Sequence, residues 1–104
     1  MATTATAAAM RGSGVVAETL GPITSADALF SKLAQALEFA DSFGHNWETL
    51  DEALRDVPAD VTLLVYEADT LWREAPDVAF ELVESWLRVA EERTAEMHLV
   101  FVWS

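Results

Sequence analysis

Val61–Tyr66 reads VTLLVY, and this stretch decides the fold because apolar residues run through it almost without interruption. A second stretch, Leu99–Trp103, reads LVFVW and has the same character. Near-continuous apolar strands are typical of parallel sheets with both faces covered, whereas half-solvated strands alternate apolar and polar residues. We therefore predict two strands of a parallel sheet. A third short apolar run, Val15–Ala17, ends at the turn signal Gly21-Pro22 and is predicted to be another strand.

Helical patterns occupy the segments between the predicted strands. Asn46 is a good N-cap, and Gly44 before it supplies the backbone freedom of a tight turn. Long helical connections between strands favour right-handed crossovers and a parallel sheet. The chain is therefore predicted to be an α/β protein, with a three-stranded parallel sheet packed with about four helices. The expected helices span about Ala26–Glu38, Trp47–Asp56, Ala68–Glu74 and Pro76–Thr94.

The composition limits both the domain organisation and the partners. The 104 residues have room for one domain, and 18 acidic residues against 6 basic ones give a net charge of −12. Such a charge repels nucleic acid and anionic membranes and attracts basic proteins. The absence of cysteine excludes disulfides and thiolate metal sites. Residues 1–14 lack the apolar core of a secretory signal, so we expect a disordered leader (1–14), one domain (15–104) and a cytoplasmic location.

The charged face of the second predicted helix needs an explanation. The apolar stripe that is expected to face the core consists of Trp47, Leu50, Ala53 and Leu54. The charged residues that project from the opposite side are Glu48, Asp51, Glu52 and Arg55. Glu48 and Glu52 form a like-charged i,i+4 pair, which costs a helix a few tenths of a kcal/mol. Glu48 complements the helix dipole, and Arg55 can pair with Asp51 or Glu52. A solvated charged face is thus one interpretation, and Glu52 is the residue it explains least.

The same region carries a resemblance to a known family. Residues 43–54 read FGHNWETLDEAL and resemble the signature of the barstar family. That signature is an aromatic-Gly turn, Asn, a bulky apolar residue, an acid, a small residue, Leu, usually Trp, an acid and later Leu. The resemblance extends from about Val15 to the C-terminus. It implies three parallel strands with four helices, and a function as the inhibitor of an extracellular ribonuclease.

The resemblance also implies which residues bind the partner. In the family, the second helix and the loop before it enter the enzyme's cleft, where their acids meet the cationic groups that normally hold RNA phosphates. By position, Glu48 and Glu52 are the helix acids, and Glu91 is a third acid on the last helix. Both helix acids are Glu where Asp is usual. The candidate partner-binding residues are Ser42, Phe43, Gly44, His45, Asn46, Glu48, Asp51, Glu52, Arg55 and Glu91.

Besides the two helix acids, three more of these candidates depart from the pattern of the best-known family member. Ser42 stands where that member carries an aromatic residue that packs on the enzyme. Asp51 replaces the usual Trp, and Arg55 adds a base to the binding face. These departures favour a different ribonuclease of the same class as the partner.

Two function classes follow from these observations. The first is a 1:1 inhibitor of a guanyl-preferring, barnase-like ribonuclease, monomeric when free. The alternative is an acidic interaction module of the same fold that binds another basic toxin or a DNA-binding protein. Because the sequence contains no paired metal-ligand histidines, Gly-rich phosphate loop, nucleophile elbow or catalytic triad pattern, we expect no metal, no cofactor and no enzymatic activity. Nucleic acid and membranes are not expected as partners.

Overall fold

The computed structural model describes residues 14–57, 60–93 and 96–103. Within them it contains three strands and four helices in the predicted order, which confirms the fold class. Of the expected leader, residues 1–13 lie outside the described residues, and Gly14 is the first residue of β1. Thr94, the expected end of the last helix, also lies outside them. The elements are β1 (Gly14–Thr19), α2 (Ala26–Leu37), α3 (Trp47–Arg55), β2 (Asp60–Tyr66), α4 (Ala68–Glu74), α5 (Pro76–Glu92) and β3 (Met97–Val102).

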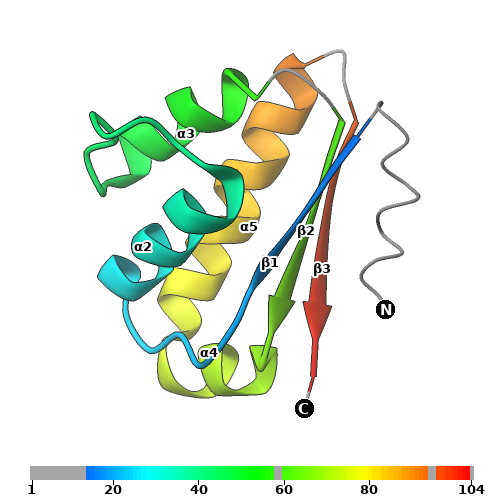
Figure 1. Ribbon diagram of the computed structural model, residues 1–104. Coiled ribbons are helices and arrows are strands. Elements are labelled where there is room, and N and C mark those ends of the chain that lie inside the picture. Colours follow the sequence, from blue (N-terminus) through cyan, green and yellow to red (C-terminus); the bar gives the residue numbers. More distant parts are fainter. Residues whose placement is uncertain (1–13, 58–59, 94–95, 104) are drawn as a thin grey trace.

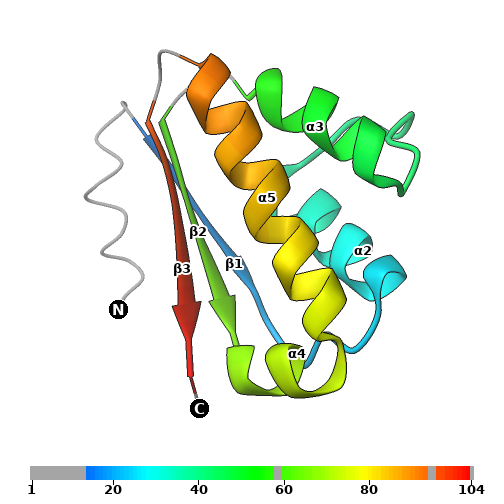
Figure 2. The same cartoon turned by 180° about the vertical axis from the view of Figure 1, so that it is seen from behind.

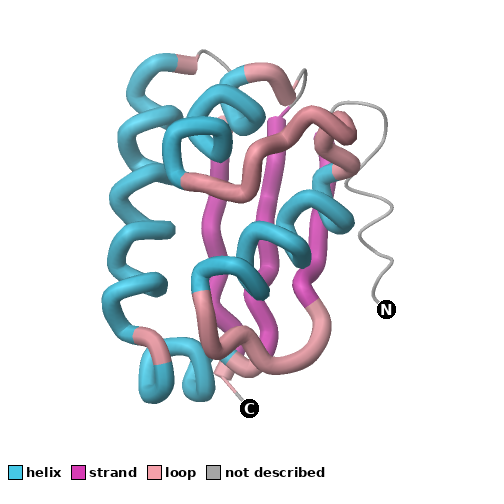
Figure 3. Tube along the Cα trace, turned by 90° about the vertical axis from the view of Figure 1, so that its left-hand side faces the viewer, coloured by secondary structure: helices cyan, strands magenta, loops and turns pink. Residues whose placement is uncertain are grey.

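The sheet has all-parallel strands in the order β1-β2-β3. Helices α2, α3 and α5 lie on one side of it, as Figures 1 and 2 show from opposite directions. In the view of Figure 3, α2 and α3 lie in front of the strands and α5 runs along their left-hand side. The prediction of a sheet covered on both faces is therefore wrong for the described part of the chain. Two right-handed crossovers that advance across the sheet in the same direction place their helices on the same face.

The core lies between this helical layer and the sheet. Val61, Leu63 and Val65 of β2 are buried, whereas the residues between them are only half-buried because they face away from the helices. The helices contribute fully or almost fully buried side chains to the same cluster: Leu29 and Leu33 from α2, Leu50 and Leu54 from α3, and Leu82, Trp86 and Val89 from α5. This single core fixes α3 and α5 against each other, and so positions the charged face of α3.

On the face of the sheet that points away from the described helices, Tyr66 ties β2 to β1. Its hydroxyl donates a hydrogen bond to Glu18 Oε2 at 3.0 Å. This hydrogen bond raises the pKa of Tyr66, and burial and the negative charge of Glu18 add to the shift. The raised pKa means that folding stabilises the protonated phenol.

Tyr66→Phe is therefore expected to lower the free energy of unfolding by about 1 kcal/mol near neutral pH. Because the pKa of Tyr66 is higher in the folded state, its contribution is fully present below the unfolded pKa of about 10. It is lost as the pH rises through the folded pKa. Urea unfolding of both proteins at neutral and alkaline pH measures this, and a difference independent of pH would assign the loss to packing.

Candidate partner-binding surface

A capping box formed by Asn46 and Thr49 marks the start of helix α3. Asn46 Oδ1 accepts a hydrogen bond from the Thr49 amide at 2.9 Å, and the Asn46 amide donates to Thr49 Oγ1 at 3.4 Å. This confirms Asn46 as the N-cap. The left-handed residue of the turn is His45, with φ of 54°, rather than the predicted Gly44. Gly44 is instead required by close approach, because a Cβ there would lie 3.1 Å from Asn46 Nδ2 and 3.2 Å from Thr49 Cγ2.

The loop before α3 is held by aromatic packing on α2. The ring of Phe43 lies 6.2 Å from that of Phe30 and 5.2 Å from that of His45, measured between centroids. His45 Nδ1 also lies 3.6 Å from Asp27 Oδ1 at the start of α2. Phe43 is half-buried against the core, whereas the neighbouring Ser42 is exposed. Phe43 and His45 therefore shape the loop, and Ser42 is presented to solvent.

The three family acids are exposed. Glu48 and Glu52 lie on the outer surface of α3, and Glu91 lies on α5, which packs against α3. Within the described residues, none of these three carboxylates accepts a side-chain hydrogen bond or forms an ion pair. Arg55 exerts a weak electrostatic attraction on Glu52. The fold thus leaves three negative charges available on two adjoining helices.

Asp51 does not belong to this exposed set, which corrects the prediction. Its side chain is only 13% exposed, and its Oδ2 accepts a hydrogen bond from Arg88 Nη1 of α5 at 2.6 Å. This bond and the charge of Asp51 raise the pKa of Arg88. Asp51 lies one position after the buried Leu50, at the border of α3 that faces α5. Its carboxylate therefore ties two helices together instead of projecting to solvent.

Arg55 also pairs differently from the prediction, which gave Asp51 or Glu52 as its partner. Its Nε donates to Glu92 Oε1 of α5 at 2.5 Å, and its Nη2 donates to Glu92 Oε2 at 3.4 Å. The hydrogen bond to Glu92 is the main reason that the pKa of Arg55 is raised. Arg93 Nη1 adds a third tie from the end of α5, to the backbone oxygen of Leu54 at 3.2 Å. The arginines thus lock α3 onto α5, and Arg55 forms no ion pair with Glu48 or Glu52.

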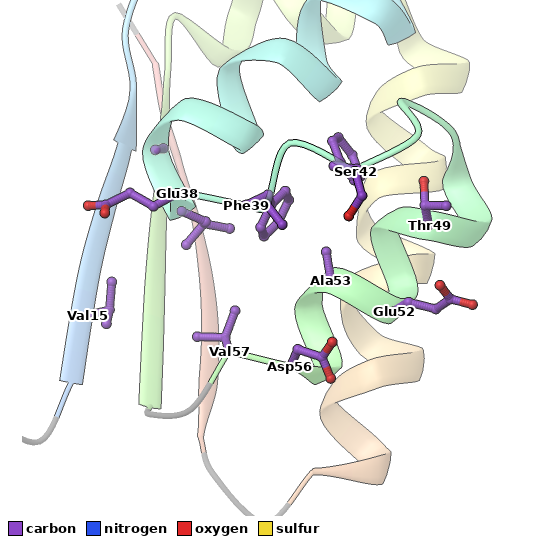
Figure 4. Close-up of a pocket in the computed structure, with 13 residues that line it drawn as sticks. Val15, Glu38, Phe39, Ser42, Thr49, Glu52, Ala53, Asp56 and Val57 are labelled. Carbon is purple, nitrogen blue, oxygen red and sulfur yellow. The ribbon is translucent and has the colours of Figure 1, made fainter.

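A cavity of approximately 480 Å³ lies beside α3, and the sequence patterns did not predict it. It opens between β1, the C-terminal end of α2, the following loop and α3 (Figure 4). Three predicted site residues, Ser42, Phe43 and Glu52, contribute to its wall. The other lining residues are Val15, Ala36, Leu37, Glu38, Phe39, Ala40, Thr49, Ala53, Asp56 and Val57. Several small alanines leave the space, but alanine alone does not signal a cavity in a sequence.

Across residues 14–57, 60–93 and 96–103, no group of three or more His, Asp or Glu side chains is placed to hold a metal ion. None of the helices in this part of the chain combines the length and apolar character needed to cross a bilayer.

Comparison with known proteins identifies the family. No curated protein matches the chain. A family model described as Barstar (barnase inhibitor) matches residues 15–103, which is nearly the whole chain and includes every candidate residue on α3 and α5. Members of this family are inhibitors rather than enzymes, and the family implies binding to a barnase-like ribonuclease. Together with the three parallel strands and four helices, this match shows that the chain belongs to the barstar (barnase inhibitor) family.

Proposed function

We propose that the chain inhibits an extracellular, guanyl-preferring ribonuclease of the barnase-like class by covering its active site with α3 and the loop before it. The observation that carries this proposal is the pair of exposed carboxylates of Glu48 and Glu52, which have no hydrogen-bond or ion-pair partner in the described chain. In the complex they would occupy the positions of RNA phosphates and meet the cations that bind those phosphates.

The electrostatics support a basic partner. A like-charged i,i+4 pair costs the free helix a few tenths of a kcal/mol, and the net charge of −12 adds further repulsion. Arg55 and Arg88, two cations beside α3, are already bonded to Glu92 and Asp51, and Arg93 is bonded to the backbone oxygen of Leu54. A partner with a cationic cleft removes this repulsion when it binds. Glu91, exposed on the adjoining helix, extends the acidic surface.

The remaining candidate residues receive different roles in this proposal. Ser42 would contact the enzyme directly because it is exposed in the loop. Gly44 and Asn46 would act by holding the start of α3, and Phe43 and His45 by packing the loop on α2. We further propose that residues 15–104 form the inhibitory domain after a leader, that the complex is 1:1, and that the free chain is a cytoplasmic monomer without catalytic activity or cofactor.

The direct test is a titration of the chain into a panel of barnase-like ribonucleases while RNA cleavage is measured. We expect at least one enzyme to lose its activity in proportion to the added chain and to reach full inhibition at a 1:1 ratio. If no enzyme of the panel is inhibited but another basic toxin or a DNA-binding protein is bound stoichiometrically, the alternative of an acidic interaction module replaces the proposal.

The association rate is expected to depend strongly on salt. Long-range attraction between the acidic chain and a basic enzyme is screened within about 8 Å at physiological ionic strength, so the on-rate should fall by roughly tenfold or more from low salt. Dissociation should change much less, since it depends on short contacts. Stopped-flow measurements with the inhibited ribonuclease provide both rates. An on-rate that stays constant over this range would contradict the phosphate-mimic mechanism.

A further inference from the structure

We propose that the outer side of α5 binds an amphipathic, basic α-helix of a second protein. The site goes beyond the proposed ribonuclease surface and does not depend on that function. Four apolar residues, which we call the outer seam, form it: Phe80, Val83, Leu87 and Ala90. Phe80 is 57% exposed and Leu87 is 58% exposed, although both are large apolar residues. These two side chains leave apolar surface in water that a partner can cover.

The outer seam is a second apolar face of α5. The first face packs into the core and consists of Val78, Ala79, Leu82, Trp86 and Val89. Val83 and Ala90 are half-buried, but they lie outside that core cluster. A helix packed against a core by one face normally carries polar residues on the opposite face. Helices α2, α3 and α4 follow this rule, since none of their large apolar residues is exposed. The core therefore does not account for the outer seam.

The spacing of the outer seam identifies a helix as its occupant. The intervals between successive members are three, four and three residues, which is the alternation of the a and d positions in a coiled-coil heptad. Such a narrow stripe is the contact surface of one helix on another, whereas a face that packs on a whole core is wider. From Phe80 to Ala90 the seam rises about 15 Å, which matches roughly three turns of a partner helix.

An acidic row runs beside the outer seam and determines the charge of the partner. It consists of Asp77, Glu84 and Glu91, which are all exposed and follow one another at intervals of seven residues. These are the e positions of the same heptad, where the charges of a coiled coil select the partner. Within the described residues, none of these three side chains forms a hydrogen bond or an ion pair. A partner helix with Lys or Arg opposite the row would therefore meet unpaired carboxylates.

The arrangement of α5 leaves this side of the helix open. Successive residues of a helix are turned by about 100°, so the acidic row lies between the outer seam and Arg88. Arg88 reaches α3, where it is bonded to Asp51, and its attraction to Glu84 is weaker. The seam therefore faces away from α3. In Figure 3, α5 is the left-hand border of the helical layer, and no described helix lies beyond it on that side.

Other occupants fit the outer seam less well. A second copy of the chain carries the same net charge of −12 and the same acidic row, so two seams repel each other. An anionic membrane is repelled for the same reason. Residues 1–13 contain one basic residue, Arg11, and no leucine, isoleucine, valine or phenylalanine with which to fill the seam. A basic helix of another protein satisfies both the apolar and the charged part of the surface.

A synthetic basic helix tests the seam directly. The peptide has about 18 residues, with Leu at a and d, Arg at e and g, and Ala elsewhere, so that its Arg rows keep two copies apart. It is titrated into the ¹⁵N-labelled full chain while amide shifts are followed. We expect saturable shifts along α5, centred on Val83 and Leu87, with a Kd of roughly 1–100 μM for this small interface.

A peptide of the same composition, in an order without the a and d pattern, is the control for charge. It should bind at least about tenfold more weakly, because it cannot cover Phe80 and Leu87 while its Arg residues face the acidic row. Equal binding of the two peptides, or shifts spread evenly over all acidic surfaces, would mean general charge attraction and would overturn the proposal.

Variants of the chain test the two parts of the surface. Phe80→Gln/Leu87→Gln should weaken peptide binding by at least about tenfold. The matched control Leu20→Gln makes the same change at a residue 67% exposed directly after β1, and should keep the wild-type Kd within a factor of about two. Glu84→Gln should weaken binding about threefold, whereas Glu48→Gln on α3 should change it less than twofold. If the double variant fails to fold, Leu87→Gln alone decides the matter.

The outcomes separate this inference from the proposed function. If no ribonuclease is inhibited, the function fails, and the peptide titration still decides whether the seam binds a basic helix. If Phe80→Gln/Leu87→Gln loses ribonuclease inhibition as strongly as Glu52→Gln, the seam belongs to the ribonuclease surface and the separate site is overturned. Analytical ultracentrifugation tests the second copy as occupant. A wild-type dimer that the double variant abolishes would also overturn the proposal.

Discussion

Glu52→Gln is expected to weaken binding of the target ribonuclease by about 2–4 kcal/mol, a factor of roughly 30 to 900 in Kd. Glu52 is the acid that helix capping explains least, since it lies in the second turn of α3. Glu52 is exposed, and it is one of the residues that line the cavity beside α3. In the proposed complex it would therefore meet the enzyme's cations directly, and glutamine keeps its size while it removes the charge. Kd is measured by inhibition of RNA cleavage at several inhibitor concentrations.

Glu74→Gln is the matched control for this experiment. It removes the same charge from an exposed site on α4, where the carboxylate contacts only the neighbouring Arg73 at 3.4 Å. The control should therefore keep the wild-type affinity within a factor of about three. Thermal unfolding should be almost unchanged in both variants, because neither side chain supports the core. Equal losses of affinity in the two variants would mean that only the net charge matters, and would remove Glu52 from the binding site.

Arg88→Met is expected to lower the melting temperature by several degrees. The substitution leaves the carboxylate of Asp51, only 13% exposed, without the cation that now lies 2.6 Å away. A poorly hydrated charge without a partner destabilises a fold far more than the intact pair stabilises it. The double variant Asp51→Leu/Arg88→Met removes both charges and should recover most of the loss, since apolar side chains can pack between α3 and α5. Thermal unfolding followed by circular dichroism gives both values.

The same variants separate a structural role of Asp51 from a binding role. If Asp51 ties α3 to α5, the folded double variant should inhibit the ribonuclease nearly as well as the wild type, because Glu48 and Glu52 remain. If the double variant stays as unstable as Arg88→Met, or is stable but loses affinity strongly, the structural assignment of Asp51 is wrong. Binding measurements should be made well below the melting temperature of each variant.

Local patterns were sufficient to predict the elements of this chain and two of their boundaries. Asn46 starts α3 because its side chain caps an amide three residues away, and Pro76 starts α5 because its ring suits the first helical turn. The apolar run of β2 and the helical connections predicted the parallel sheet. The acids Glu48 and Glu52 were found through a resemblance over a few neighbouring residues. Each of these patterns involves residues that are close together in the sequence, so each can be identified from the sequence alone.

Contacts between distant segments were decided only by the tertiary structure. Asp51 and Arg88 lie 37 residues apart, as do Arg55 and Glu92, and no spacing rule relates them. A helical wheel shows which residues lie outside the apolar stripe. It does not show which of the polar residues beside that stripe will be covered by a second helix. The placement of α2, α3 and α5 on one face of the sheet follows from the direction of both crossovers, and the cavity forms where the ends of α2 and α3 meet β1. Packing of separate elements determines these features, because the free energy of such contacts depends on positions that no local pattern specifies.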